Sequence, residues 1–120
     1  FCSTPMVALS RNITRKHAME MLLIGDEIDA VTATRFGLIN KHVETNLLDE
    51  SVMEIASKIA SKSSHTISIG KKAFYKQLEL NVSEAYEYAT EVMVENLLAK
   101  DAKEGMGAFL EKRQPNWQNE

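Results

Sequence analysis

The sequence lacks most features that mark a secreted, membrane-spanning or nucleic-acid-binding protein. A single cysteine, Cys2, stands among 120 residues, so no disulfide can form within the chain, as is usual in a reducing compartment. No apolar run approaches the roughly 20 residues that a membrane-spanning helix needs. The net charge is only −3, whereas nucleic-acid binding usually requires a basic face. We therefore expect neither a membrane span nor a nucleic-acid partner.

Proline is also scarce, which leaves the middle of the chain free to be helical. The two prolines, Pro5 and Pro115, stand near opposite ends, so neither interrupts the residues between them. Hydrophobic residues make up 44% of the chain and charged residues 26%, as in ordinary globular proteins. The chain begins with Phe rather than Met and shows no targeting segment, and we expect it to be part of a longer protein.

Capping residues outline three helices in the first forty residues. The predicted helices cover residues 5–11 after Thr4, 15–24 after Thr14 and 30–36 after Asp29. Gly25 and Gly37 follow the last two helices and suit a left-handed C-cap. Leu38–Val43 then alternates apolar and polar residues and includes β-branched ones, which predicts a short strand.

The rest of the chain has the periodicity of four further helices. They are expected between residues 46 and 63, from about 66 to 80, over 84–99 after Ser83, and from Asp101 onward. Glu104 lies three residues after Asp101, as in a capping box. The first of these helices has a continuous apolar stripe of Leu48, Val52, Ile55, Ala56, Ile59 and Ala60. Because these helices are amphipathic, we expect another layer or subunit to cover their apolar faces.

Two sequence signatures resemble those of the enoyl-CoA hydratase/isomerase (crotonase) family. The first is Ala18–Ile28, followed by Ala33 and Phe36–Ile39, and the second is Asp101–Trp117. They occur in the family's order and at matching spacing. The resemblance implies a mainly α fold class, namely the helical C-terminal portion of a crotonase fold with at most one or two short strands. Residues 1–45 would then end the crotonase core, and residues 46–120 would form a helical region for trimerisation and a CoA lid.

The resemblance also implies a function in acyl-CoA chemistry. Proteins of this family act on CoA thioesters, assemble as trimers or hexamers, and stabilise an enolate with two backbone N–H groups and one or two carboxylates. In typical hydratases these groups precede the segment that the chain matches. We therefore expect no catalytic residue and no cofactor here, coenzyme A being part of the thioester substrate. Whether the parent protein is an active hydratase or isomerase stays open.

Two residues of the last predicted helix match family positions that contact a neighbouring subunit's CoA. They are Phe109, which would pack on the adenine, and Lys112, whose ammonium would approach a phosphate. Arg113 is a second candidate for the same phosphate. The alternative is structural: Phe109 would pack in the core of an amphipathic helix, and the two cations would complement the helix dipole.

One departure from the family pattern concerns the first residues. Phe1–Pro5 stands where hydratases have a glycine-rich turn, and Cys2 lies near the position of a second acid in some relatives. A thiol is a poor replacement for a carboxylate at neutral pH. A non-catalytic acyl-CoA-binding or oligomerising protein, or a truncated helical interaction module, is therefore the alternative function. With Lys71–Leu78, this run resembles a mitochondrial branch of the family, which predicts a mitochondrial location.

The remaining candidate residues favour ordinary structural roles. Glu20, within a predicted helix, and Glu27, which follows that helix, are expected to be solvated, and Cys2 is expected to be a small packed thiol. The three histidines do not have the spacing of a metal site; they are His17, His42 and His65.

Overall fold

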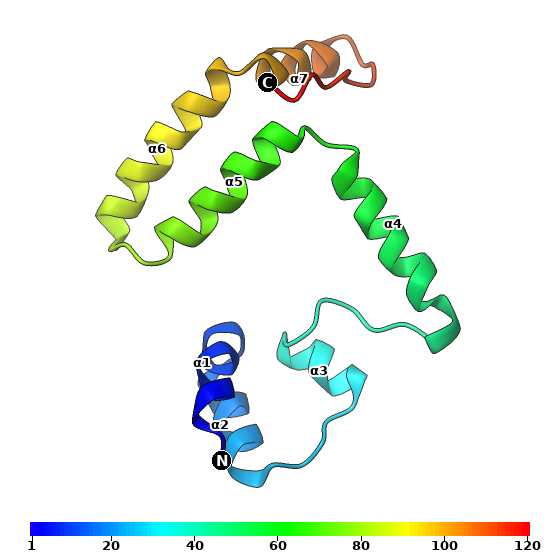
Figure 1. The fold of residues 1–120 in the computed structure, drawn as a ribbon, viewed down its shortest axis with the longest axis vertical. Coiled ribbons are helices and arrows are strands. Elements are labelled where there is room, and N and C mark those ends of the chain that lie inside the picture. The colour runs from blue at the N-terminus through cyan, green and yellow to red at the C-terminus, as the bar shows by residue number, and fades with distance from the viewer. The chain divides into compact units, whose positions relative to one another are not determined.

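The computed structural model describes residues 1–120 as helices joined by loops (Figure 1). In chain order, the helices are α1 (Ser3–Asn12), α2 (Arg15–Ile24), α3 (Ala30–Phe36), the 3-10 helix η1 (Thr45–Leu47), α4 (Leu48–Ala60), α5 (Ser64–Gln77), α6 (Val82–Leu98) and α7 (Lys100–Leu110). The chain divides into two compact units, here called unit 1 (Phe1–Ser51) and unit 2 (Val52–Glu120). Helix α4 begins in unit 1 and continues into unit 2.

Short-range capping bonds define α2 and α3 in unit 1. The Thr14 side chain accepts a hydrogen bond from the N–H of His17 (3.4 Å), and Asp29 accepts one from the N–H of Thr32 (2.7 Å). At the other ends, Gly25 and Gly37 have φ values of 77° and 79°, a conformation that costs glycine little. Both predicted helices are confirmed. The predicted N-cap of the first helix is wrong, because α1 begins one residue before Thr4.

The strand predicted over Leu38–Val43 is absent, and with it the predicted fold class is wrong. The N–H groups of Leu38 and Ile39 donate to the carbonyl of Ala33 (2.9 and 3.4 Å), which closes the C-terminal end of α3. The alternating pattern therefore follows a helix cap, and no segment of the chain pairs with it as a ladder. Instead of a mainly α portion with one or two short strands, residues 1–120 contain helices and loops only.

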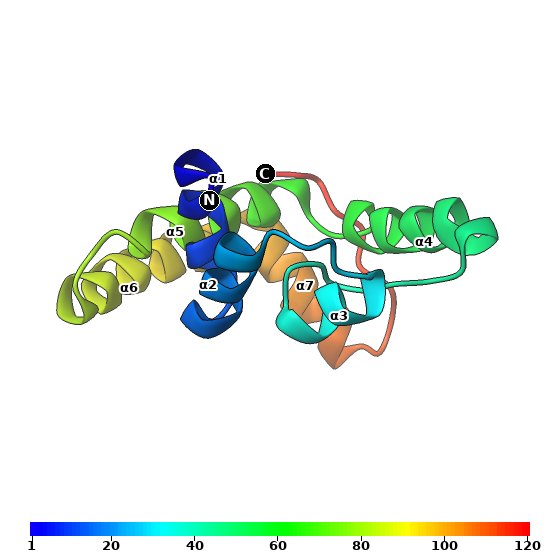
Figure 2. The same ribbon diagram turned by 90° about the horizontal axis from the view of Figure 1, so that it is seen from below.

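In unit 2, α5 and α6 form a hairpin and lie side by side in both views (Figures 1 and 2). Helix α5 starts after Ser63, whose side chain accepts from the N–H of Thr66 (3.2 Å). Helix α6 starts with a capping box in which Asn81 and Glu84 bond each other's backbone N–H groups. The prediction that Ser83 caps this helix is wrong by two residues.

The apolar core is small for a chain of this length. Only four apolar residues are buried, namely Ile13, Ala18, Ala33 and Ala108. The accessible surface is 9867 Å², whereas two separate compact bodies of these sizes would expose about 8,000 Å². The uncovered area includes apolar helix faces, as on α4, where Val52, Ile55 and Ile59 are each about half exposed. Their stripe has no covering layer within unit 2.

No helix has both the length and the apolar character needed to cross a bilayer.

The predicted roles of residues 1–45 and 46–120, as the end of a catalytic core and as a trimerisation and lid region, stay predictions.

Candidate functional site

The two predicted site residues lie at the C-terminal end of α7. Phe109 belongs to the last turn, and 82% of its surface is exposed, so it is not a core residue of this chain. Lys112 follows the helix and is exposed as well. No ion pair involves its ammonium. An exposed aromatic ring and an unpaired cation are therefore three residues apart at one helix end.

The backbone of Lys112 has an unusual conformation for a side chain of this kind. Its φ is 54°, in the left-handed region. The N–H of Lys112 donates to Phe109 O (3.2 Å) and that of Arg113 to Ala108 O (3.0 Å), the two bonds of a Schellman cap. Glycine or asparagine usually occupies this position, and a lysine there costs about 1 kcal/mol. Surrounding interactions must hold Lys112 in place.

Arg113 provides such interactions through two carboxylates. Its guanidinium bonds both oxygens of Glu104 (Nη1 to Oε1 2.6 Å, Nη2 to Oε2 3.0 Å), and its Nε bonds Glu111 (2.6 Å). The hydrogen bond from Arg113, together with one from the N–H of Asn116, lowers the pKa of Glu104 to about 2. The hydrogen bond to Glu104, and then that to Glu111, raises the pKa of Arg113. Arg113 is committed to these partners, which makes Lys112 the better candidate for a ligand phosphate.

Asp101 does not cap α7 as predicted. The helix begins after Ala99, and Asp101 lies in the first turn with only 1% of its surface exposed. Its oxygens accept from the N–H groups of Gln118 (2.7 Å) and Asn119 (3.0 Å) in the C-terminal tail. Burial raises the pKa of Asp101, but hydrogen bonds from Ser63 and the tail outweigh it, so that the pKa is lowered overall. Asp101 is thus an anchor for the tail.

The tail is also fixed at Trp117 and Asn119. The indole N–H of Trp117 donates to the carbonyl of Ser61 (2.8 Å), just after α4. Its ring lies so close to Gly105 that a Cβ there would come within 3.2 Å of it. The side-chain oxygen of Asn119 accepts from the N–H and hydroxyl of Ser64 at the start of α5 (2.9 and 2.8 Å). The tail therefore connects α4, α5 and α7.

Beside the tail lies an open cavity of about 510 Å³ between α5, α6 and α7. Its apolar lining includes Ile67, Met106 and Trp117. Among its polar residues, Thr66 donates its hydroxyl to Asn96 (3.2 Å). These polar groups bond each other, and the buried carboxylate of Asp101 is already engaged. Apart from Asp101, the only charged residue of the lining is Lys62, and a single lysine does not define a ligand.

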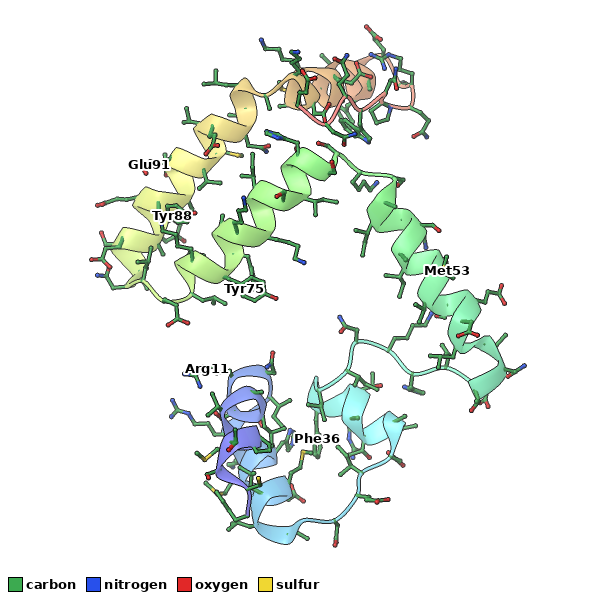
Figure 3. All side chains as sticks on the ribbon, viewed as in Figure 1. Arg11, Phe36, Met53, Tyr75, Tyr88 and Glu91 are labelled. Carbon is green, nitrogen blue, oxygen red and sulfur yellow. The ribbon has the colours of Figure 1, made fainter.

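The other candidate residues occupy structural positions. His17 of α2 stacks on Phe36 of α3, with ring centroids 3.7 Å apart, and Figure 3 shows Phe36 between these helices. Cys2 is exposed and unpaired, so the prediction that its thiol is packed is wrong. On α5, Tyr75 points away from α6 (Figure 3), whereas Lys76 lies 4.2 Å from the Tyr88 ring of α6. No three acidic, histidine or cysteine side chains are grouped as in a metal site.

The geometry at the end of α7 lies within a sequence segment shared with known proteins. The chain matches the family described as "Enoyl-CoA hydratase/isomerase" over residues 2–120. It is 50% identical over 117 residues to the enoyl-CoA hydratase domain-containing protein 3, mitochondrial, of Rattus norvegicus, covering 98% of this chain and 39% of that protein. The Homo sapiens protein of the same name is 48% identical over 120 residues, which cover 100% of this chain and 40% of that protein.

Solved structures agree with these matches. The chain is similar to an enoyl-CoA hydratase from Mycobacterium smegmatis, with 44% identity and a TM-score of 0.94. It is also similar to the human enoyl-CoA hydratase domain-containing protein 3, with 49% identity and a TM-score of 0.92. Each match covers 98% of this chain and 46% of the other.

The chain thus spans about two fifths of the length of the curated relatives it matches. Several of these relatives carry "mitochondrial" in their names, in agreement with the predicted mitochondrial location. The match of the family over residues 2–120, at up to 50% identity to its members, identifies the family. The chain belongs to the enoyl-CoA hydratase/isomerase family.

Proposed function

We propose that this chain is the C-terminal part of an enoyl-CoA hydratase/isomerase-like protein and binds acyl-CoA thioesters of fatty-acid metabolism without catalysing a reaction by itself. The observation that carries the proposal is the pairing of an exposed aromatic ring, Phe109, with the unpaired ammonium of Lys112 at the end of α7. An aromatic face suits the adenine of CoA, and an ammonium suits a phosphate.

The state of the acidic groups supports a binding role for the chain. A general acid or base works best with a pKa near the working pH. Asp101 and Glu104 instead have lowered pKa values, and hydrogen bonds from the backbone and from Arg113 occupy their oxygens. We therefore expect the isolated 120-residue chain to show no hydration of short-chain or medium-chain enoyl-CoA. A rate proportional to the concentration of this chain would contradict the proposal.

Binding is tested on the full natural protein that contains this chain. Calorimetry with butyryl-CoA, a saturated thioester that cannot be hydrated, separates binding from turnover. We expect Lys112→Gln to weaken binding about five-fold, as for a partly exposed charge contact. Lys103→Gln makes the same charge change at an exposed position within α7 and is expected to alter affinity less than about two-fold. Equal effects of the two substitutions would remove the support for this site.

A second proposed role is assembly into a homotrimer or hexamer. It is supported by the uncovered stripe of Val52, Ile55 and Ile59 on α4, because contiguous exposed apolar surface is typical of interfaces. The test is sedimentation of the full natural protein. Ile55→Lys is expected to shift it to smaller species, whereas Ser57→Lys, at an exposed polar position of the same helix, should leave its size unchanged. An unchanged size for Ile55→Lys would contradict this role.

A further inference from the structure

The end of α7 is tied by one side chain from an earlier turn. Glu104 accepts from Arg113 Nη1 and from the N–H of Asn116 at one oxygen (2.6 and 2.7 Å), and from Arg113 Nη2 at the other (3.0 Å). We call Glu104, Arg113 and Asn116 the Glu104 clamp. Its bonds span nine and twelve residues, so they connect the middle of the helix to the segment that follows it. The Glu104 side chain is only 21% exposed, which limits the competition from water.

The backbone of Lys112 is fixed on both sides, by α7 and by the Glu104 clamp. On the N-terminal side, Lys112 is bonded to the last turn of α7 through Phe109 O (3.2 Å), and on the C-terminal side it is followed by the clamped Arg113. A left-handed lysine persists only where the surrounding structure fixes it. No interaction of its own side chain does so, because the ammonium is unpaired. The position of Lys112 is therefore determined by its neighbours.

We propose that Glu104 is a positioning residue which, through Arg113, holds Lys112 in place and so sets the preference of this site for a ligand that carries a nucleotide phosphate. This inference rests on the proposed CoA binding. Arg113 makes three hydrogen bonds to carboxylates, and its role is to connect Glu104 to the Schellman cap at the end of α7. The ammonium of Lys112 is then the group that distinguishes a ligand with the phosphate from one without it.

The experiment compares ligands that differ only in that group. The full natural protein is titrated with CoA and with 3′-dephospho-CoA, and the ratio of the two dissociation constants is measured. We expect the wild-type protein to favour CoA about five-fold, and Lys112→Gln to bring the ratio close to one. A wild-type ratio in Lys112→Gln would overturn the proposed contact and this inference together.

The clamp is tested with substitutions that conserve charge. Arg113→Lys keeps the cation but loses the planar fork that engages both oxygens of Glu104. Glu104→Asp keeps the carboxylate but shortens it by one methylene. Both are expected to reduce the CoA preference to less than about two-fold, and Lys112→Gln should have no further effect on the ratio in either background. Two variants are used, and thermal unfolding of each identifies a variant that folds poorly, so that the test rests on one that folds.

A purely structural role would change both dissociation constants in proportion. If Arg113→Lys and Glu104→Asp lower the unfolding temperature but keep the five-fold ratio, while Lys112→Gln abolishes it, Lys112 contacts the phosphate without help from the clamp. That result would overturn this inference and leave the proposed function in place. A ratio that falls in both clamp variants, with folding retained, supports it.

Discussion

The hydrogen bonds within unit 1 differ in range from those within unit 2. In unit 1, every hydrogen bond joins residues at most ten positions apart, the longest being Lys41 to Ser51. In unit 2, Trp117 bonds Ser61 and Asn119 bonds Ser64 across 56 and 55 positions. The hydrogen bonds of unit 1 are therefore local, and they include the caps of α2 and α3, whereas those of unit 2 include bonds from a C-terminal tail that returns to its helices.

The difference shows how the end of α7 is maintained. The tail is anchored by Asp101 in the first turn of the helix, and the segment before it is tied by Glu104 in the second. Both ends of the segment that contains Lys112 are thereby fixed. We infer that the tail contributes to the geometry of the candidate site.

The largest expected effect comes from removing the tail. Deletion of residues 114–120 leaves the buried Asp101 without its two backbone donors and removes the indole of Trp117. We expect the unfolding temperature of unit 2 to fall by roughly 10 °C. Hydrogen exchange followed by mass spectrometry should show faster exchange in α5 and α7. The amides of α2 and α3 in unit 1 serve as the internal control. Equal acceleration of exchange in both units would contradict the view that the tail stabilises unit 2 alone.

Sequence reasoning succeeded where unit 1 relies on such local contacts. Thr14, Gly25, Asp29 and Gly37 each act within a few residues, and the two helices they delimit were predicted with the correct bounds. The strand over residues 38–43 was wrong because its first N–H groups close the preceding helix. An alternating pattern alone does not reveal that these donors already have a partner.

In unit 2 the same reasoning assigned Asp101 and Glu104 to a capping box at the start of α7, and the structure has no capping box at that helix. Asp101 is instead bonded to Gln118 and Asn119, and Glu104 to Arg113. A capping box and a long-range anchor have the same residue types at the same spacing, so the local pattern cannot separate them. Phe109 and Lys112 were proposed from a family resemblance, whereas the role of Arg113 depended on distances that only coordinates provide.

A second prediction concerns the start of α2 in unit 1. Thr14→Ala removes the side-chain acceptor at the start of α2 and should lower the free energy of unfolding by about 1 kcal/mol. Because the contact is local, exchange should accelerate in α2 and remain unchanged in α5–α7. Thr14→Ser retains the hydroxyl and is the matched control. Faster exchange in unit 2 after Thr14→Ala would show that the units are coupled.

A third prediction concerns two glycines of α7, which differ only in what surrounds them. In a helix interior, alanine is more favourable than glycine by up to about 1 kcal/mol. At Gly107 an added Cβ would meet nothing closer than 3.9 Å, so Gly107→Ala should gain most of this stability. At Gly105 it would lie 3.2 Å from the Trp117 ring, so the tail must shift and the gain should be smaller or lost. Denaturant unfolding followed by Trp117 fluorescence measures both, and equal gains would contradict close packing of the tail.

A fourth prediction is a pH dependence that arises at the Glu104 clamp. The pKa of Glu104 is lowered from 4.5 to about 2 in the folded protein, so its carboxylate stabilises the fold above pH 4.5. That contribution should decrease as the pH falls from 4.5 toward 2, because protonation then becomes easier in the unfolded chain than in the folded one. The difference in unfolding free energy between the wild-type protein and Glu104→Gln should therefore be constant near neutral pH and shrink in this window. Glu20→Gln, at an exposed position of α2 in unit 1, is the control and should give a difference that varies less with pH. If the difference in unfolding free energy between the wild-type protein and Glu104→Gln stays constant down to pH 2, the Glu104 carboxylate is not bonded to Arg113 in solution. That result would contradict the Glu104 clamp.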